Sequence, residues 1–149
     1  MDDVNSSTLG VSDTGTYSVD VIISENCTTS DEILVEFYIP EEVNNLPTLN
    51  SCDNFIVDGD GIFDLNEQNI NIINQLTSDQ FTITYYESEE DAISDLNLIS
   101  NPGSYDNSIA FTQTIFARIV PDSNPTCFSI SSFLIETTNP QDLIVKKAL

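Results

Sequence analysis

One arrangement occurs twice in this chain and limits the folds open to it. A run of alternating apolar and polar residues leads into a short polar turn with a cysteine and then into a second such run. This happens over residues 17–37 around Cys27 and again over residues 115–135 around Cys127. Alternation with a period of two is typical of β-strands that bury one face. Two such hairpins predict an all-β chain built from related modules.

We therefore divide the chain into one incomplete and one complete module. The expected parts are the C-terminal strands of a preceding immunoglobulin-like module (1–39), a linker (40–47), a complete β-sandwich repeat (48–137) and a tail (138–149). The pattern Asp13-x-Gly15-x-Tyr17 is similar to the tyrosine corner of immunoglobulin-like sandwiches. The predicted fold is thus an immunoglobulin-like antiparallel β-sandwich.

The three cysteines suggest a disulfide within this division of the chain. Cys52 opens the complete module and Cys127 lies near its end, so these two are expected to form a disulfide bond. Cys27 is then left unpaired, because its partner would come before residue 1. In an oxidising compartment the bridge would stabilise the module by roughly 4 kcal/mol in the chain-entropy model. The alternative is three reduced cysteines in the core.

An acidic, glycine-containing stretch stands at the start of the complete module. Its carboxylates are Asp53, Asp58, Asp60 and Asp64, and they lie close to Gly59 and Gly61, which permit tight turns. Asp58 and Asp60 match the first two ligands of an EF-hand loop, but Ile62 occupies the third position, so the stretch is not an EF-hand. It predicts either a short calcium-binding loop of these four aspartates or an acidic β-turn without metal.

Short helices are expected between the strands of the complete module. Ile70, Ile73 and Leu76 recur at a spacing of three, which predicts a short helix within 66–76. Ser88 precedes a run of acidic residues and is placed as a helix N-cap.

The complete module has a single basic residue. Arg118 stands among the apolar residues of a predicted strand. A lone arginine on a strand is usually a structural ion-pair partner, so we expect it to pair with a carboxylate such as Glu87.

The charge balance excludes several classes of partner. The chain has 25 acidic residues, three basic residues and no histidine, which gives a formal net charge of -22. Nucleic acids and anionic membranes bind proteins mainly through Lys and Arg, so we expect no nucleic-acid partner. No stretch reaches the roughly 18 to 20 apolar residues of a membrane helix, so direct membrane insertion is not expected either. The charge favours cations, and it favours solubility outside the cell.

Composition also restricts catalysis. Without histidine there is no Ser-His-Asp or Cys-His pair and no imidazole metal ligand. A carboxylate-dependent hydrolase would still need two acids facing each other across a cleft, which is usually lined by aromatic residues, and the chain has no Trp. We therefore expect that the protein is not an enzyme.

Several motifs follow one another along residues 46–137. They are Leu-Pro-Thr-Leu-Asn-Ser-Cys-Asp (46–53), Asp-Gly-Asp-Gly-Ile-Phe-Asp-Leu (58–65), Phe-Thr-Ile-Thr-Tyr-Tyr (81–86), Glu-Asp-Ala-Ile (90–93), Asn-Pro-Gly-Ser-Tyr-Asp-Asn (101–107), Ile-Phe-Ala-Arg-Ile (115–119) and Cys127. This order resembles the repeat of very large, multi-repeat surface proteins of Bacteroidetes. These proteins include gliding-motility adhesins that are exported by the type IX secretion system.

The resemblance implies a secreted or surface-anchored, outer-membrane-associated repeat without catalytic residues, arranged in series in an adhesive stalk and stiffened by calcium and a disulfide. The first residues carry no signal-peptide pattern, so we expect a piece of a longer exported chain. Expected partners are neighbouring repeats of the same chain, and a surface polysaccharide or another cell-surface protein. The alternative is a carbohydrate- or ligand-binding accessory module of a secreted enzyme, which exposed Tyr85, Tyr86 or Tyr105 in a shallow groove would support.

Overall fold

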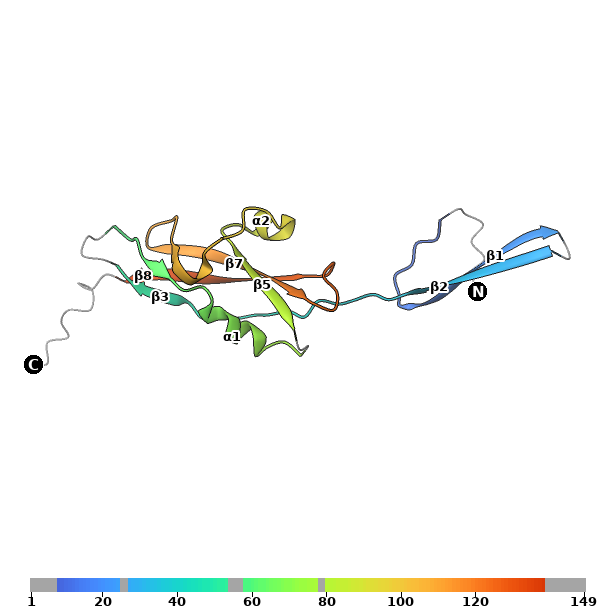
Figure 1. Ribbon diagram of the computed structural model, residues 1–149, viewed down its shortest axis with the longest axis horizontal. Helices are drawn as coiled ribbons and strands as arrows, with labels where there is room; N and C mark the ends of the chain where they lie inside the picture. Colours follow the sequence, from blue (N-terminus) through green and yellow to red (C-terminus); the bar gives the residue numbers. More distant parts are fainter. Residues whose placement is uncertain (1–7, 25–26, 54–57, 78–79, 139–149) are drawn as a thin grey trace, which may run out of the picture. The chain divides into compact units, whose positions relative to one another are not determined.

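The chain forms two compact units, Met1–Ile39 and Pro40–Leu149. A computed structural model describes residues 8–24, 27–53, 58–77 and 80–138, so the predicted tail lies outside the described residues except for Thr138. The first unit contains β1 (Gly15–Ser24) and β2 (Cys27–Val35), which pair as an antiparallel hairpin. The second unit contains β3 (Leu49–Cys52), β4 (Ile62–Phe63), α1 (Glu67–Ile73), β5 (Phe81–Tyr86), α2 (Glu89–Ser94), the 3-10 helix η1 (Pro102–Ser104), β6 (Tyr105–Asp106), β7 (Thr112–Pro121) and β8 (Ser129–Thr138) (Figure 1). The predicted all-β, sandwich-like fold is confirmed.

A four-stranded sheet in the order β3-β8-β7-β5 forms the centre of the second unit. β7 pairs antiparallel with both β5 and β8. β3 runs parallel to β8, with Leu49 opposite Ile135 and Cys52 opposite Thr138. The sheet is therefore mixed, whereas the strand pattern predicts purely antiparallel pairing. Parallel pairing is possible because the chain between β3 and β8 crosses the whole module instead of turning back directly.

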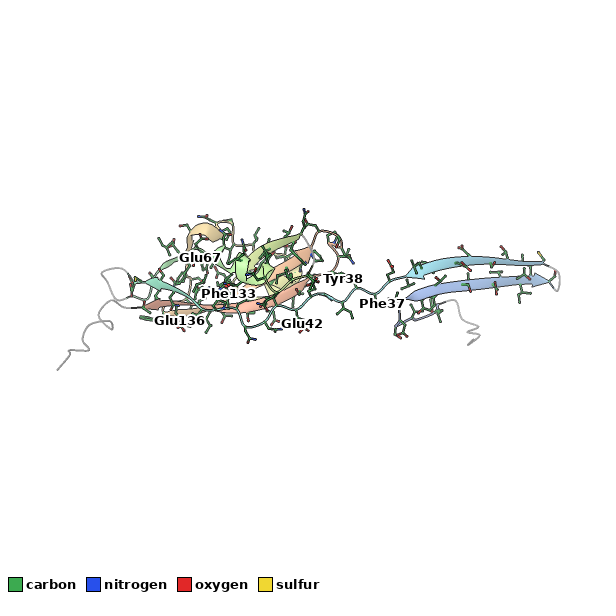
Figure 2. All side chains as sticks on the ribbon, turned by 90° about the horizontal axis from the view of Figure 1, so that it is seen from below. Phe37, Tyr38, Glu42, Glu67, Phe133 and Glu136 are labelled. Atoms are coloured by element: carbon green, nitrogen blue, oxygen red, sulfur yellow. The ribbon has the colours of Figure 1, made fainter. Side chains whose placement is uncertain are left out.

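The apolar core lies on one face of this sheet. Tyr85 is opposite Ala117, and Ile115 is opposite Phe133, so their side chains share that face. The rings of Tyr85 and Phe133 meet edge to face with centroids 5.9 Å apart. Ile72 of α1 packs into the same core and is fully buried. Other members of the core are Val43, Phe63, Leu65, Tyr105, Ile119 and Ile135. Figure 2 shows Phe133 in the body of the unit and Glu136 nearer the end of β8.

Residues 40–47, which the sequence predicts as a linker, are held by the second unit. Val43 is 5% exposed and belongs to its core. The carboxylate of Glu41 accepts hydrogen bonds from the backbone N and the Oγ1 of Thr77, at 2.6 and 2.9 Å. The stretch therefore forms part of the second unit, because an apolar side chain at its centre is better buried than exposed.

α2 covers the opposite face of the sheet (Figure 1). Its start confirms the predicted N-cap, since the backbone N of Asp91 donates to Ser88 Oγ at 3.1 Å. Its end is closed by Asp95 in the left-handed conformation, with φ 54°. Ala92 is the residue of this short helix that is buried against the sheet.

Arg118 joins α2 to the sheet. Its Nη1 donates to the carbonyl oxygens of Ala92 at 2.9 Å and Ile93 at 3.3 Å. Its guanidinium carbon lies 3.5 Å from the ring centroid of Phe128. The predicted ion pair with Glu87 is wrong. Carbonyl oxygens in the last turn of a helix have no partner within the helix, and here the arginine supplies one.

The hairpin of the first unit repeats the register of β7 and β8. Tyr17 is opposite Ile33 in one hairpin, and Ile115 is opposite Phe133 in the other. In each, the second residue follows the turn cysteine by the same number of positions (33 − 27 = 6 and 133 − 127 = 6). Cys27 thus occupies in the first unit the place that Cys127 occupies in the second.

The tyrosine corner predicted in the first unit is present. Tyr17 Oη donates to the backbone oxygen of Asp13 at 2.6 Å. The apolar face of the hairpin, however, remains open to solvent. Val21 is 49% exposed, whereas Ile119 at the equivalent register position of the second unit is 1% exposed. Among the described residues, the first unit has no counterpart of α1 to cover this face.

We expect Arg118→Ala to lower the free energy of unfolding of the second unit by about 2 kcal/mol. The change removes two hydrogen bonds from a charged donor and a cation–π contact, and leaves helix-end carbonyls unpaired. Denaturant unfolding followed by circular dichroism measures the loss. Arg118→Lys is the matched control, because lysine keeps the charge but lacks the planar guanidinium. Its free energy of unfolding should lie between that of the original chain and that of Arg118→Ala. A lysine variant as stable as the original chain would contradict this account.

Candidate functional site at the two ends of the module

The acidic loop of residues 58–61 is fixed by hydrogen bonds to distant parts of the chain. The carbonyl oxygen of Gly59 accepts from Asn107 Nδ2 at 2.9 Å and from Thr137 Oγ1 at 3.0 Å. The backbone N of Gly61 donates to Asn107 Oδ1 at 2.7 Å. Asn107 therefore binds the backbone on both sides of Asp60, and Thr137 holds the loop against the end of β8.

Close packing accounts for the two glycines. Gly59 has φ +83°, and a Cβ there would lie 2.7 Å from the backbone N of Phe111. A Cβ on Gly61 would lie 2.6 Å from Thr137 Cγ2 and 3.3 Å from Ser51 Cβ. The glycines that suggest a metal loop in the sequence are thus required by close approach, of Gly59 to the residue before β7 and of Gly61 to the ends of β3 and β8.

The four aspartates predicted as a metal site do not converge. Asp58 Oδ1 accepts from the backbone N of Asp60 at 3.2 Å, and Asp64 Oδ1 accepts from the backbone N of Asn66 at 3.0 Å. Such turns direct each carboxylate to the backbone two residues on. In residues 8–24, 27–53, 58–77 and 80–138, no three Cys, Asp or Glu residues are placed to hold a metal ion. The predicted cluster of Asp53, Asp58, Asp60 and Asp64 is therefore not formed.

Asp53 differs from the other three because it is buried. It is 4% exposed, and its Oδ2 accepts from the backbone N of Gly59 at 3.0 Å. Its Oδ1 is buried and has no hydrogen-bond partner among the described residues. Burial of an unpaired carboxylate oxygen is costly. Among the described residues at and beside the acidic loop, this atom is consequently the point where the observed geometry favours an added cation or donor.

Cys52 and Cys127 lie at opposite ends of β8. Cys52 is opposite Thr138, the last residue of β8, whereas Cys127 comes two residues before Ser129, the first. The extended chain from 129 to 138 spans about 30 Å, and a disulfide requires Cα atoms within about 7 Å. All three cysteines are free. The predicted Cys52–Cys127 bond within one module is wrong, because β3 runs parallel to β8.

The alternative of three cysteines in the core is wrong as well. Cys27 and Cys52 are exposed, and Cys127 is partly exposed. Cys27 stands at the first position of β2, and its predicted unpaired state stays a prediction.

Cys52 and Cys127 each mark one end of the second unit. At the leading end, where the chain comes in, Glu41 binds Thr77, and the backbone N of Asp122 donates to the carbonyl oxygen of Gln80 at 3.2 Å. Cys127 follows Asp122 in the same turn between β7 and β8. At the trailing end, where β8 stops, lie Cys52, Asp53, the acidic loop and Phe111. Figure 1 shows the turn between β7 and β8 and the end of β3 at opposite ends of the sheet.

The tyrosines that an aromatic binding groove would need are buried. Tyr85, Tyr86 and Tyr105 are 2%, 0% and 7% exposed. Burial raises the pKa of all three phenols above the ordinary value. Tyr85 donates to Asn69 Oδ1 at 2.6 Å, and Tyr105 accepts from Gln113 Nε2 at 2.8 Å. A shallow, open depression of about 260 Å³ is lined mainly by the loop from Asn97 to Asn101, and Tyr105 is one of its other lining residues. It presents no aromatic platform to a sugar.

Residues 48–142 match the family model of the Flavobacterium inter-domain disulphide bond domain. The chain belongs to this family. The match covers more than half of the 149 residues and includes Cys52, the acidic loop and Cys127. Flavobacterium is a genus of the Bacteroidetes, so the predicted resemblance to proteins of that group is confirmed at the level of a domain family. No curated protein and no solved structure matches the chain. None of the described helices has the length and apolar character needed to cross a bilayer.

Sequence reasoning missed two polar residues that organise this region. Asn107 contacts a glycine 46 positions away, and nothing near it in the sequence indicates that contact. Gln113 is 3% exposed, and its Oε1 accepts from the backbone N atoms of Ser108 at 2.9 Å and Ile109 at 3.2 Å. Its place at a spacing of two before Ile115 and Ala117, on the inward face of β7, is the signal that identifies it as a buried polar residue.

Asn107→Ala is expected to destabilise the second unit by about 2 to 3 kcal/mol. It removes the donors to Gly59 and Ile109 and the acceptor for Gly61, which leaves partly buried backbone groups without partners. Urea denaturation quantifies the effect. Asn50→Ala is the control, since Asn50 is exposed and makes one long hydrogen bond, and it should change stability by less than about 0.5 kcal/mol. Similar losses in both variants would argue against the proposed role of Asn107.

Proposed function

We propose that this chain is a non-catalytic structural repeat that resists tension in an exported bacterial surface protein. The observation that carries the proposal is the parallel pairing of β3, the first strand of the second unit, with β8, the last. Their register runs from Leu49 opposite Ile135 to Cys52 opposite Thr138. Tension on the two ends of the unit pulls these neighbouring strands in opposite directions along their shared ladder.

Shear of this kind loads all the bonds of a ladder together, whereas peeling breaks them one by one. The ladder is extended at the trailing end, where Asp53 N donates to the Thr138 carbonyl at 3.1 Å and Thr138 Oγ1 donates to the Ser51 carbonyl at 3.3 Å. Thr137 also binds Gly59, so the acidic loop is fastened to the same strand. These contacts support a mechanical function for the loop in place of a catalytic one.

The biological setting is also part of the proposal. The family description supports disulfide links to neighbouring repeats, and the net charge of -22 suits a soluble surface outside the cell. We place the parent protein at the cell surface in association with the outer membrane, with export by type IX secretion and an adhesive role in gliding motility. Its target would be a surface polysaccharide or another cell-surface protein. The accessory carbohydrate-binding alternative has less support, because Tyr85, Tyr86 and Tyr105 are buried.

A proline test separates shear resistance from general stability. The backbone N of Asp53 donates to the Thr138 carbonyl of β8. Because the N–H groups of a strand alternate in direction, the N of Ser51 also points to β8, and the N of Asn50 points away from it. In single-molecule pulling of the full chain from its ends, Ser51→Pro should lower the unfolding force of the second unit severalfold. Asn50→Pro, which removes an N–H at the open edge, is the matched control and should retain most of the force. Equal forces in the two variants would refute the shear mechanism.

We also propose that the second unit binds a calcium ion at Asp53. The observation that supports this proposal is the buried Oδ1 of Asp53, which has no hydrogen-bond partner among the described residues. We expect millimolar calcium to raise the thermal unfolding midpoint of the original chain relative to chelator, because a ligand of the folded state stabilises it by mass action. Asp53→Asn should abolish this rise. In chelator the variant should be at least as stable as the original, since it loses a buried charge and keeps an acceptor for Gly59. Magnesium is the ion control. An equal calcium response in both proteins would place any ion elsewhere.

A further inference from the structure

We propose that the two Asp-Gly bonds of the acidic loop are sites of spontaneous isomerisation to isoaspartate, and that the folded chain protects them through Asp53 and Asn107. The two bonds, 58–59 and 60–61, are the only Asp-Gly pairs in the sequence, which has no Asn-Gly pair. The inference goes beyond the proposed function and does not rest on it, because it concerns the chemical durability of the loop.

The reaction needs only groups of the chain and water. The backbone N of the glycine attacks the protonated side-chain carboxyl of the preceding aspartate. The N–H proton and the carboxyl hydroxyl leave as water, and a succinimide ring closes. Water then opens the ring at the original backbone carbonyl, which leaves the glycine joined to the side-chain carboxyl carbon. The product has the mass of the original chain, but its backbone is longer by one CH2 group. Glycine has no side chain to shield its N, so Asp-Gly is a reactive pair.

The first of the two bonds is protected by Asp53. The backbone N of Gly59 donates to Asp53 Oδ2 at 3.0 Å, and Asp53 is 4% exposed. To attack the carboxyl of Asp58, this N has to leave its acceptor and the peptide has to rotate. Gly59 is buried, and a Cβ on it would lie 2.7 Å from the backbone N of Phe111, so little space is open for that rotation.

The second bond is protected by Asn107. The backbone N of Gly61 donates to Asn107 Oδ1 at 2.7 Å. Gly61 is buried as well, and a Cβ on it would lie 2.6 Å from Thr137 Cγ2. Asp60 is exposed, and none of the residues that the structure describes donates a hydrogen bond to its carboxylate. The hydrogen bond from Gly61 is therefore the main restraint on this site.

Isomerisation would damage the part of the unit that the loop fastens. The carbonyl oxygen of Gly59 accepts from Asn107 Nδ2, Thr137 Oγ1 and the backbone N of Phe111. Both glycines already touch neighbouring segments, so an added CH2 group in the backbone beside them would displace these contacts. The same hydrogen bonds that hold the loop to β8 thus also prevent the reaction that would release it.

The test compares the full chain in its folded state with the same chain unfolded in urea, both in a mildly acidic buffer. Digestion after glutamates yields the peptide of residues 43–67, because Glu42 and Glu67 flank the loop. Mass spectrometry detects the succinimide by its loss of one water, and backbone fragments assign isoaspartate to either site. We expect both bonds to react at least about tenfold more slowly in the folded chain, because attack requires local opening.

Substitutions at Asn107 separate the acceptor from its other contacts. Asn107→Ala should raise isoaspartate at Asp60 severalfold, because the N of Gly61 loses its acceptor. Asn107→Asp is the matched control. It loses the Nδ2 bonds to Gly59 and Ile109 but keeps an oxygen acceptor for Gly61, so the reaction at Asp60 should stay near the original rate.

Substitutions at Asp53 give the corresponding test for the first bond. Asp53→Ala should raise isoaspartate at Asp58 severalfold, whereas Asp53→Asn keeps an acceptor for the N of Gly59 and should not. Because the expected rise follows the acceptor and not the charge, these variants also distinguish protection from the proposed binding of calcium.

Three outcomes would overturn the inference. The first is an equal rate in the folded and the unfolded original chain. The second is a rate in Asn107→Asp or Asp53→Asn as high as in the corresponding alanine variant. The third concerns Arg118→Ala, which lowers stability without touching the loop. A rise there as large as in Asn107→Ala would show that general loss of stability, and not the lost acceptor, controls the reaction.

Discussion

The second unit depends on the parallel pairing of its first and last strands. Parallel neighbours cannot be joined by a tight turn, so the chain between β3 and β8 has to travel the length of the module and return. The short strands β4 and β6, both helices, β5 and β7 occupy that path. One consequence is a sheet with α1 and the apolar core on one face and α2 on the other (Figure 1). A second consequence is that β3 and β8 end side by side, with Cys52 opposite Thr138.

The trailing end shows how local chemistry serves this pairing. β3 is only four residues long and lies at the edge of the sheet, so it has few bonds of its own. The acidic loop adds to them through Gly59, whose carbonyl accepts from Asn107, Thr137 and the backbone of Phe111. The loop can approach that closely because glycines occupy its second and fourth positions. Its carboxylates are directed mostly to nearby backbone N–H groups, which is why an acidic, glycine-containing stretch here is a packing element.

Sequence reasoning succeeded where a feature depends on nearby residues. The tyrosine corner joins Tyr17 to a residue four positions away, the cap of α2 depends on Ser88 and Asp91, and the alternation of apolar residues located the main strands. It failed where a feature depends on distant contacts. The ladder between Leu49 and Ile135 spans 86 positions (135 − 49 = 86), and whether it is parallel cannot be read from alternation. The direction of β3 relative to β8 was unknown, and this led to the wrong prediction of a Cys52–Cys127 bond. Cysteines near the start and the end of a module lie close together only if its first and last strands are antiparallel.

The glycines and Arg118 illustrate a different limit. Glycine is favoured both where a loop wraps an ion and where two segments nearly touch, since each requires the absence of a side chain, so the pattern alone does not distinguish them. Arginine satisfies either a carboxylate or free helix-end carbonyls, and in a chain with 25 acidic residues the carboxylate is the obvious choice. Arg118 binds the carbonyl oxygens at the end of α2, because α2 packs against β7, the strand that carries Arg118. An isolated cation thus serves the internal structure of the unit, while the unbalanced negative charge stays at the surface.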